Sequence, residues 1–411
     1  MRVVIRVVVW WRRVSHPCHN SVTPSIYGCG MAKGSVQRRG TVWSFVVDLG
    51  ADPATGRRRQ ARRSGFATKK AAEAALRSLA TASDNGTAVA RSRTTVSGFL
   101  TEWLETMRPR IRETSWVSYE MAANRITRQI GAVPLQALTP LQVESLYASL
   151  LASGGAGGRP LAPKTVRNCH IVLRRALADA ERLGLVSRNP AAAARAVAAP
   201  RAEQRTWSSE EIQRFFEALA GERLSMTFVL LATTGMRRGE VLGLRWEDVD
   251  FAGRALSIVQ TLTTVRGDKH IGPPKTGKSR RRVSIDAVTL DALKAHRKRQ
   301  RVERIAAADV WSNSGDLVFT DELGESVHPN RLSQSFDRNV RAAGLPRIRL
   351  HDLRHSYATL ALKAGVHPKI VSERLGHSTI AITLDLYSHV AQGLDADAAE
   401  LIAARIYGST R

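Results

Sequence analysis

Proton-transfer and anion-binding side chains are concentrated in one stretch near the end of the 411-residue sequence. His351 and Arg354 are three positions apart at the start of a helical pattern, so they share one face of that helix. A second predicted helix stops at Gly376, His377 follows it at once, and Tyr387 comes ten positions later. Histidine exchanges protons near neutral pH, arginine binds anions and tyrosine can act as a nucleophile. This density of reactive groups indicates an active site.

Two earlier segments supply groups of the same kind. The segment TTGMRRGE places Arg237 just after a predicted helix break at Gly235, and PPKTGKSRR places Lys275 in a loop between two predicted strands. Such a set suits strand transfer at a DNA phosphodiester. That reaction needs an in-line nucleophile, positive donors for the phosphorane oxygens and a proton for the leaving 5′-oxygen.

Each of these needs has a candidate residue. Tyr387 suits the nucleophile, because a phenoxide both attacks and leaves well and so preserves the bond energy for religation. The rigid guanidinium forks of Arg237 and Arg354 suit the binding of the phosphorane oxygens. His351 can accept or return the phenolic proton, and Lys275 is the best candidate acid for the leaving oxygen. The set requires neither a metal ion nor a cofactor, and no convincing acidic triad for divalent ions is evident.

Several neighbouring residues compete for these roles. Arg238 adjoins Arg237, and Lys278 competes with Lys275. Glu240 is predicted to be a buried partner that orients an arginine rather than an acid catalyst. A lone histidine is usually structural, which is the role expected of His355 and His389.

The charge balance points to a polyanionic partner. Lys and Arg number 62 against 36 Asp and Glu, which gives a net charge of +26, and 43% of the residues are hydrophobic. The chain is therefore globular, and polyanions are its natural partners. A basic protein that merely coats RNA has the same charge but does not explain the histidine and tyrosine cluster.

The cysteines indicate a reduced setting. Cys18, Cys29 and Cys169 support no disulfide framework, so a cytoplasmic, nucleoid-associated location is expected. His16 and His19 lie beside Cys18, but their spacing matches no usual zinc site.

Residues 1–30 look foreign to the rest of the chain. The run MRVVIRVVVWWRR is too short to span a bilayer, is interrupted by Arg6 and lacks a small-residue cleavage site. We interpret the segment as a translation start placed too far upstream, with Met31 the real start. The alternative is an extra edge strand or a disordered arm. No transmembrane segment is predicted.

Residues 31–85 are predicted to form a small three-stranded sheet plus a helix. Val42–Leu49 is rich in β-branched and aromatic residues, and a helix with Ala72 and Leu76 on its buried side begins at Thr68. The segment between them is strongly basic. A solvated basic face is the simple interpretation, but strands laid against a DNA duplex fit better. The candidate DNA-binding residues here are Arg57, Arg58, Arg59, Arg62 and Arg63.

Residues 94–186 are predicted to be a helical bundle. Apolar residues recur at helical spacing over four segments, and Thr139-Pro140 is an N-cap followed by proline. The second helix displays Arg125 and Arg128, which are candidate DNA contacts. Residues 187–206 are the predicted linker.

Residues 207–393 are predicted to mix helices and strands. Ser208 and Glu211 match a capping box, and a helix over Thr227–Thr234 ends at Gly235. The predicted strands are Leu256–Leu262, Arg282–Ile285 and Leu317–Thr320. Residues 394–411 form a last predicted helix.

The segments TGMRRGE, PPKTGKSRR, HDLRH, LGHS and LYSH resemble the signature boxes of the tyrosine recombinase family, in its phage integrase branch. The resemblance implies a multidomain, mostly α fold with small β-sheets (α+β): an arm-binding sheet, a four-helix core-binding bundle and a mixed α/β catalytic domain. It also implies a homotetramer on DNA attachment sites, with the last helix docking on a neighbour. A host DNA-bending protein and an excisionase are further candidate partners. The residue roles that it implies are phosphate activation by Arg237 and Arg354, general acid Lys275, proton transfer by His351, a second phosphate contact from His377, and a 3′-phosphotyrosyl bond at Tyr387.

Two other functions share these features. One is a catalytically silent DNA-binding protein of the same fold, against which the intact set of reactive residues argues. The other is a type IB-like topoisomerase, which uses the same chemistry. The basic amino-terminal sheet favours recombination, because relaxation of supercoils needs no second site reader.

Overall fold

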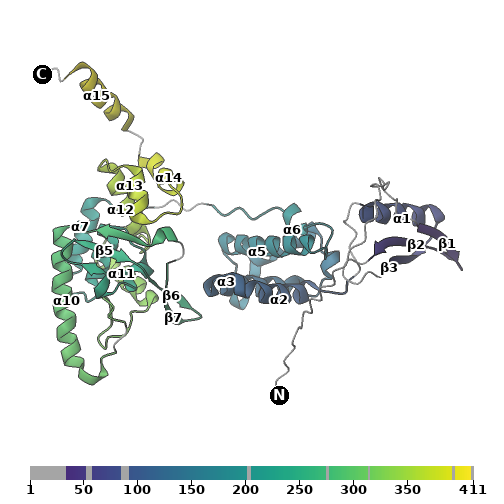
Figure 1. Ribbon diagram of the computed structural model, residues 1–411, viewed down its shortest axis with the longest axis horizontal. Coiled ribbons are helices and arrows are strands. Elements are labelled where there is room, and N and C mark those ends of the chain that lie inside the picture. The colour runs from purple at the N-terminus through teal and green to yellow at the C-terminus, as the bar shows by residue number, and fades with distance from the viewer. Residues whose placement is uncertain are drawn as a thin grey trace, which may run out of the picture. The chain divides into compact units, whose positions relative to one another are not determined.

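The protein is mostly helical, with small antiparallel sheets (Figure 1). A computed structural model describes residues 34–51, 58–84, 92–200, 205–274, 277–312, 315–390 and 394–408. The predicted α+β class is confirmed. Residues 1–30, Met31 and the histidines and cysteines near position 18 lie outside the described ranges. No helix in these ranges is long and apolar enough to cross a bilayer.

The amino-terminal strands form an antiparallel sheet in the order β1-β2-β3, and α1 packs on it (Figure 1). Phe45 and Val47 are two positions apart on the central strand and are both fully buried, as expected for one face of a strand. Ala72 of α1 is fully buried as well. The predicted strand and helix are therefore both present. Their bounds are β1 Gly34–Arg39, β2 Val42–Ala51, β3 Arg58–Phe66 and α1 Lys69–Asp84.

Four long helices follow, as predicted: α2 Val96–Met107, α3 Glu113–Ile130, α4 Pro140–Ser153 and α5 Pro163–Arg182. Each buries an apolar stripe. On α2, for example, Leu100, Trp103 and Leu104 are all at least nine-tenths buried. The Thr139 hydroxyl accepts a hydrogen bond from the backbone N–H of Gln142 at 3.3 Å, which is the N-cap that the sequence indicates. The short helix α6 (Pro190–Ala193) comes next.

The region that begins at Trp207 packs around an aromatic core. Neighbouring rings in this core have centroids 5.1–5.7 Å apart, and the rings are those of Trp207, Phe215, Phe228 and Phe336. Ser208 and Glu211 form the predicted capping box at the start of α7. The helices are α7 Ser209–Ala218, α8 Ser225–Thr234, α9 Arg238–Leu242, α10 Ala287–Ala307 and α11 Pro329–Ala342. The strands are β4 Val249–Asp250, β5 Ala255–Ile258, β6 Thr261–Val265, β7 Asp268–Gly272 and β8 Arg281–Ser284.

Two strand predictions were wrong in this region. The single strand predicted over Leu256–Leu262 is two strands, β5 in the sheet β4-β5-β8 and β6 in a hairpin with β7. The chain leaves the first sheet at Gln260, whose side-chain amide donates to the Gly243 carbonyl at 2.8 Å. Leu317–Thr320 makes only isolated bridges. A buried glutamine of α10, Gln300, donates to the carbonyls of Leu317 and Val318 at 3.1 and 3.2 Å, where a neighbouring strand would otherwise bond.

The last helices are α12 Asp352–Lys363, α13 Pro368–Leu375, α14 Ala381–Val390 and α15 Leu394–Tyr407. Pro368 opens α13 and Gly376 closes it in the left-handed conformation (φ 65°), as predicted. The helix α14 packs on α12 and α13. The Ser356 hydroxyl of α12 accepts from the Trp207 backbone N–H at 2.9 Å, which ties this helix to the start of the region.

Candidate active site

Gly235 sets the direction in which the chain leaves α8. It has φ 64°, and a Cβ there would lie 2.5 Å from Leu375 Cδ2 and 2.6 Å from Tyr357 Cδ1. Only glycine fits such a left-handed residue in so small a space. The turn makes Arg237 the N-cap residue of α9. The helix break inferred from sequence therefore positions the first candidate arginine.

Glu240 is the anchor of this arginine. Its carboxylate accepts from Arg237 Nη1 at 2.7 Å and from the Arg237 backbone N–H at 2.9 Å. The same carboxylate accepts from Arg281 Nη1 and Nη2 at 3.1 and 2.8 Å. Burial pushes the pKa of Glu240 upward, but the hydrogen bonds and charges of Arg281 and Arg237 outweigh it, so the net pKa is lowered. Glu240 is thus ionised and holds two arginines.

Arg281 is a site residue that the sequence analysis missed. Its side chain is 7% exposed, and its Nε donates to the Arg374 carbonyl at 2.5 Å. It stands at the start of β8, directly after the loop that carries Lys275. Arg281 is the last residue of the segment PPKTGKSRR, and this position was the only sequence feature that pointed to it.

Arg354 is the most buried cation of the site, at 3% exposure. Its Nη1 donates to the Gly235 carbonyl and its Nη2 to the Leu375 carbonyl, both at 2.6 Å. Burial, and then the nearby charge of Arg237, lower the pKa of Arg354 to about 9. The guanidinium is still charged at neutral pH. Of its five N–H donors, these two bonds use two, so donors are left for an anion.

The end of α13 brings His377 to the two arginines. Arg237 Nη2 donates to the Gly376 carbonyl at 3.0 Å, one residue before His377. His377 Nδ1 pairs with the Thr383 hydroxyl at 2.8 Å. Burial, followed by the charges of Arg354 and Arg237, lowers the pKa of His377 to about 4. The imidazole is therefore neutral at pH 7.

His351 is the residue at the N-cap position of α12, and its side chain makes no capping hydrogen bond and keeps solvent access. Even so, partial burial lowers its pKa to about 4, with further contributions from His355 and Arg354. The rings of His351 and His355 meet edge to face, with centroids 5.2 Å apart. Asp352 accepts from Arg349 Nε and Nη2 at 3.0 and 2.8 Å, which fixes the turn that presents His351.

Position 387 lies on α14, four residues after Thr383. Thr383 is fully buried against His377, and residues four apart share one face of a helix. The backbone of α14 therefore places position 387 one turn beyond the histidine contact. The side chain of Tyr387 lies outside the described part of the structure, as do Lys275 and the side chain of Lys278. The structure thus gathers Arg237, His351, Arg354 and His377, and leaves the predicted nucleophile and acid undescribed.

The candidate DNA-binding arginines differ in their surroundings. Arg58 is exposed and pairs with Asp48 at 2.7 Å. Arg125 is half-buried and interacts with the buried thiol of Cys169, whose pKa is raised by burial. Arg63 is half-buried as well, whereas Arg62 and Arg128 are exposed. Arg57 and the side chain of Arg59 lie outside the described residues. Within the described ranges, no three His, Cys, Asp or Glu side chains are grouped to hold a metal ion.

Family models match three parts of the chain. The phage integrase family matches residues 205–393, an arm DNA-binding domain matches residues 35–82, and the N-terminal SAM-like domain of phage integrases matches residues 95–151. From the amino terminus the matches are therefore the arm DNA-binding domain, the SAM-like domain and the phage integrase domain, in that order.

Relatives and solved structures agree with these matches. A tyrosine recombinase XerC-like protein of Caldanaerobacter subterraneus subsp. tengcongensis is 31% identical over 355 residues, 82% of this chain and 89% of the relative. The ICEBs1 integrase of Bacillus subtilis is 27% identical, over 62% of this chain and 68% of the relative. The Tn1549 transposon integrase, solved with transposon right end DNA, shares the fold at a TM-score of 0.64 and 19% identity, over 76% of this chain and 100% of that one. A lambda integrase tetramer bound to a Holliday junction shares the fold at a TM-score of 0.52 and 17% identity. That match covers 84% of this chain and 95% of the lambda integrase chain.

The chain therefore belongs to the tyrosine recombinase family, in its phage integrase branch. It is an enzyme, a tyrosine-type site-specific DNA recombinase. These relatives are recombinases and integrases, so a silent DNA-binding protein and a topoisomerase are not favoured.

Proposed function

We propose that the protein integrates or excises a mobile element by cutting and rejoining DNA through Tyr387. The phenolic oxygen of Tyr387 attacks the scissile phosphorus as the bond to the 5′-oxygen breaks, which forms a 3′-phosphotyrosyl ester and a 5′-hydroxyl. Lys275 gives the leaving oxygen its proton, and His351 takes the phenolic proton. Attack by a 5′-hydroxyl on the ester then restores the tyrosine and rejoins the DNA.

One observation carries the proposal: Arg237 and Arg354 are held close enough that the charge of Arg237 disfavours the charged form of Arg354. The charge of Arg237 lowers the pKa of Arg354, and both guanidinium groups bind carbonyls beside His377. Glu240 supplies one negative charge for the three cations Arg237, Arg281 and Arg354, so the cluster keeps a net positive charge that costs stability unless a further anion binds. A phosphodiester supplies that anion, and its charge rises toward the phosphorane.

The two histidines suit different tasks within this site. His351 is neutral at pH 7, since its pKa is about 4, so it can accept a proton during attack. His377 pairs through Nδ1 with Thr383, and its Nε2 has no partner among the described residues. Nε2 can therefore contact a phosphate oxygen. These are the roles that the sequence resemblance implies for the two histidines.

The partners follow from the family. We propose double-stranded attachment-site DNA as substrate and a homotetramer as the active assembly, with α15 docking on a neighbouring copy. The lambda integrase neighbour is a tetramer on a Holliday junction, which supports this assembly. The arginines of β3 and α3 contact DNA in this proposal. A host DNA-bending protein, an excisionase and a cytoplasmic, nucleoid-associated location are parts of the same proposal.

Recombination between two plasmids tests the function directly. One plasmid carries the attachment site of the element and the other that of its host, both read from the element's junctions. The protein should join them, also in EDTA, and the Tyr387→Phe variant should not. A variant lacking residues 31–85 should lose arm-site binding but still cleave the core site. Joining by Tyr387→Phe, or a strict need for magnesium, would contradict the proposal.

A further inference from the structure

The helix α10 carries a line of cations along one face. Each of these cations has another member three or four residues away, so they share one face and form one stripe, here called the α10 basic stripe: Lys294, Arg297, Lys298, Arg301 and Arg304. From Lys294 to Arg304 the stripe is about 15 Å long, at about 1.5 Å of rise per residue. Lys298, Arg301 and Arg304 are exposed to solvent.

Most of the stripe is not neutralised by the protein. The helix has two acidic residues, and neither serves the middle of the stripe. Asp291 pairs with Lys294 at 2.8 Å, and Glu303 turns away to Arg223 at 2.5 Å. Among the described residues, no carboxylate forms an ion pair with Lys298, Arg301 or Arg304. The stripe therefore carries positive charge that the protein leaves uncompensated and that a bound anion would neutralise.

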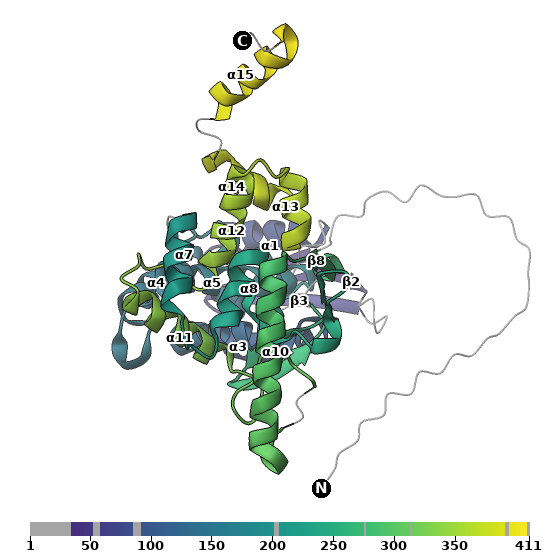
Figure 2. The same cartoon turned by 90° about the vertical axis from the view of Figure 1, so that its left-hand side faces the viewer.

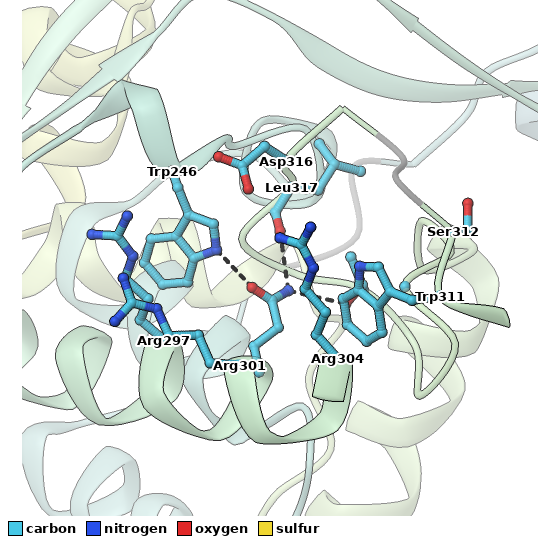
Figure 3. A pocket seen from close by; sticks show the side chains of 11 residues that line it. Trp246, Arg297, Arg301, Arg304, Trp311, Ser312, Asp316 and Leu317 are labelled. Carbon is cyan, nitrogen blue, oxygen red and sulfur yellow. Dashed lines mark hydrogen bonds between the residues drawn. The ribbon is translucent and has the colours of Figure 1, made fainter. Parts of the chain in front are cut away.

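Three of these arginines line a pocket of about 160 Å³ beside Trp246, Trp311 and Asp316 (Figure 3). Arg297 lies over the rings of Trp246 and Phe251, at 5.2 and 5.4 Å. The indole N–H of Trp246 donates to Gln300 Oε1 at 2.6 Å, which fixes the ring. Arg297 and Arg301 lie on the Trp246 side of the pocket and Arg304 lies on the Trp311 side (Figure 3). Part of the stripe is therefore held in place before any partner binds.

The stripe is remote from the candidate active site. Figures 1 and 2 both show the carboxyl-terminal half of α10 at the opposite end of the region that begins at Trp207 from α12 and α13. The residues gathered around Arg354 therefore cannot share one phosphate with the stripe. An anion bound by the stripe is therefore separate from the phosphate at the active site.

We propose that the α10 basic stripe binds the phosphate backbone of duplex DNA outside the catalytic site, an inference that rests on the DNA-directed function proposed above. A strand of B-DNA carries one phosphate per about 3.4 Å of axis, so a 15 Å stripe matches about four base pairs. Phosphate contacts of this kind hold a duplex in place without reading its sequence. The stripe keeps flanking DNA, or DNA that bends back, on the enzyme.

An acidic protein is the alternative partner. Val302 and Ile305 are exposed on the neighbouring face of α10, at 61% and 80%, and an apolar partner surface could cover them. A straight row of cations and an overall charge of +26 favour DNA. Phosphate binding does not need the apolar face, so Val302→Ser should leave DNA affinity unchanged.

Charge reversal at two positions tests the proposal. The variant Arg301→Glu with Arg304→Glu is compared with Arg338→Glu with Arg341→Glu, exposed positions on α11 that change the net charge equally. Binding of a long duplex of random sequence is measured by fluorescence anisotropy over a range of salt. We expect the α10 variant, but not the α11 variant, to bind DNA about tenfold more weakly. The slope of log affinity against log salt concentration should also become shallower by about two for the α10 variant. Arg301→Lys with Arg304→Lys should restore both, which guards against misfolding.

Core-site cleavage separates this proposal from the proposed function. The α10 variant should still cleave a short suicide duplex that carries only the core site, because cleavage uses the residues around Arg354 and not the stripe. If the α10 variant had the same DNA affinity and salt slope as the α11 control, the proposal would be overturned. The acidic protein would then be the partner of the stripe. Loss of short-duplex cleavage with unchanged long-duplex binding would overturn it too. Failure of the unchanged protein to cleave would count against the proposed function instead.

Discussion

Arg281 donates two hydrogen bonds to the carboxylate of Glu240, at 3.1 and 2.8 Å, and the two side chains are only 7% and 3% exposed. The pair joins the start of β8 to α9. Arg237 donates to the same carboxylate at 2.7 Å. Because Arg237 keeps a more open position, at 37% exposure, it can face a substrate while Arg281 holds its anchor. The orientation of Arg237, the arginine proposed to bind phosphate, therefore depends on a buried ion pair.

Replacing Glu240 by Gln should separate positioning from binding. The amide keeps the shape of the side chain but leaves the buried Arg281 charge without a counterion, a loss of about 3–5 kcal/mol when one member of a buried pair is removed. We expect unfolding at lower urea concentration and core-site cleavage slowed by about tenfold or more, with DNA affinity nearly unchanged. The exposed Glu217→Gln is the control. Cleavage at the unchanged rate would remove Glu240 from the site.

Truncation of Arg354 should affect the rate more than the binding. In the proposed mechanism its buried guanidinium stabilises charge on the phosphorane, and removal of one such donor costs on the order of 10²-fold in rate. Single-turnover cleavage of a suicide duplex by Arg354→Ala is compared with that by the exposed-site variant Arg338→Ala. Arg237→Ala should behave like Arg354→Ala. A rate within a few-fold of the unchanged protein would contradict the assignment.

Removing the hydroxyl of Thr383 should disturb His377. The hydroxyl pairs with His377 Nδ1 at 2.8 Å and lies on the helix that carries position 387. Thr383→Val keeps the shape and removes the hydrogen bond, so we expect cleavage to slow by about tenfold, while Thr383→Ser restores it. Because the contact is internal, DNA affinity should not change. Equal rates for the Val and Ser variants would show that the bond does not position the histidine.

The stability of the protein should fall on mild acidification. His351 and His377 have pKa values of about 4 in the folded protein, below the ordinary value of 6.5. Between these values the unfolded chain binds protons that the folded protein does not, so the free energy of unfolding decreases as pH falls. Urea unfolding should show no change from this cause above pH 6.5 and a progressive loss from there toward pH 5, before the carboxylates titrate. His377→Gln should lessen the loss. Stability that rises over this range would contradict the assigned environments.

Local sequence signals predicted much of the fold around the site. Glycines at positions 235 and 376 end α8 and α13, and Pro368 opens α13, because helix ends have a local chemistry that shows in the sequence. The capping box at Ser208 was evident for the same reason. These signals were enough to separate the segments that carry the candidate residues.

Long-range partners could not be predicted in this way. Arg281 meets Glu240 across 41 positions, and nothing local to either residue reveals the pair. The false strand at Leu317–Thr320 has the same origin, since its carbonyls are bonded by Gln300 of α10. A run of apolar residues predicts burial, but the partner of its backbone depends on the whole fold.

Peptide mapping of a trapped covalent complex tests the central claim most directly. The protein is incubated in EDTA with a suicide duplex that carries the core site, so that the cleaved strand diffuses away and the ester persists. After proteolysis, mass spectrometry should locate a nucleotide remnant on the peptide that contains Tyr387, joined through a 3′-phosphate. No adduct should form with Tyr387→Phe. A remnant on another residue, or an adduct of equal yield with Tyr387→Phe, would contradict the account.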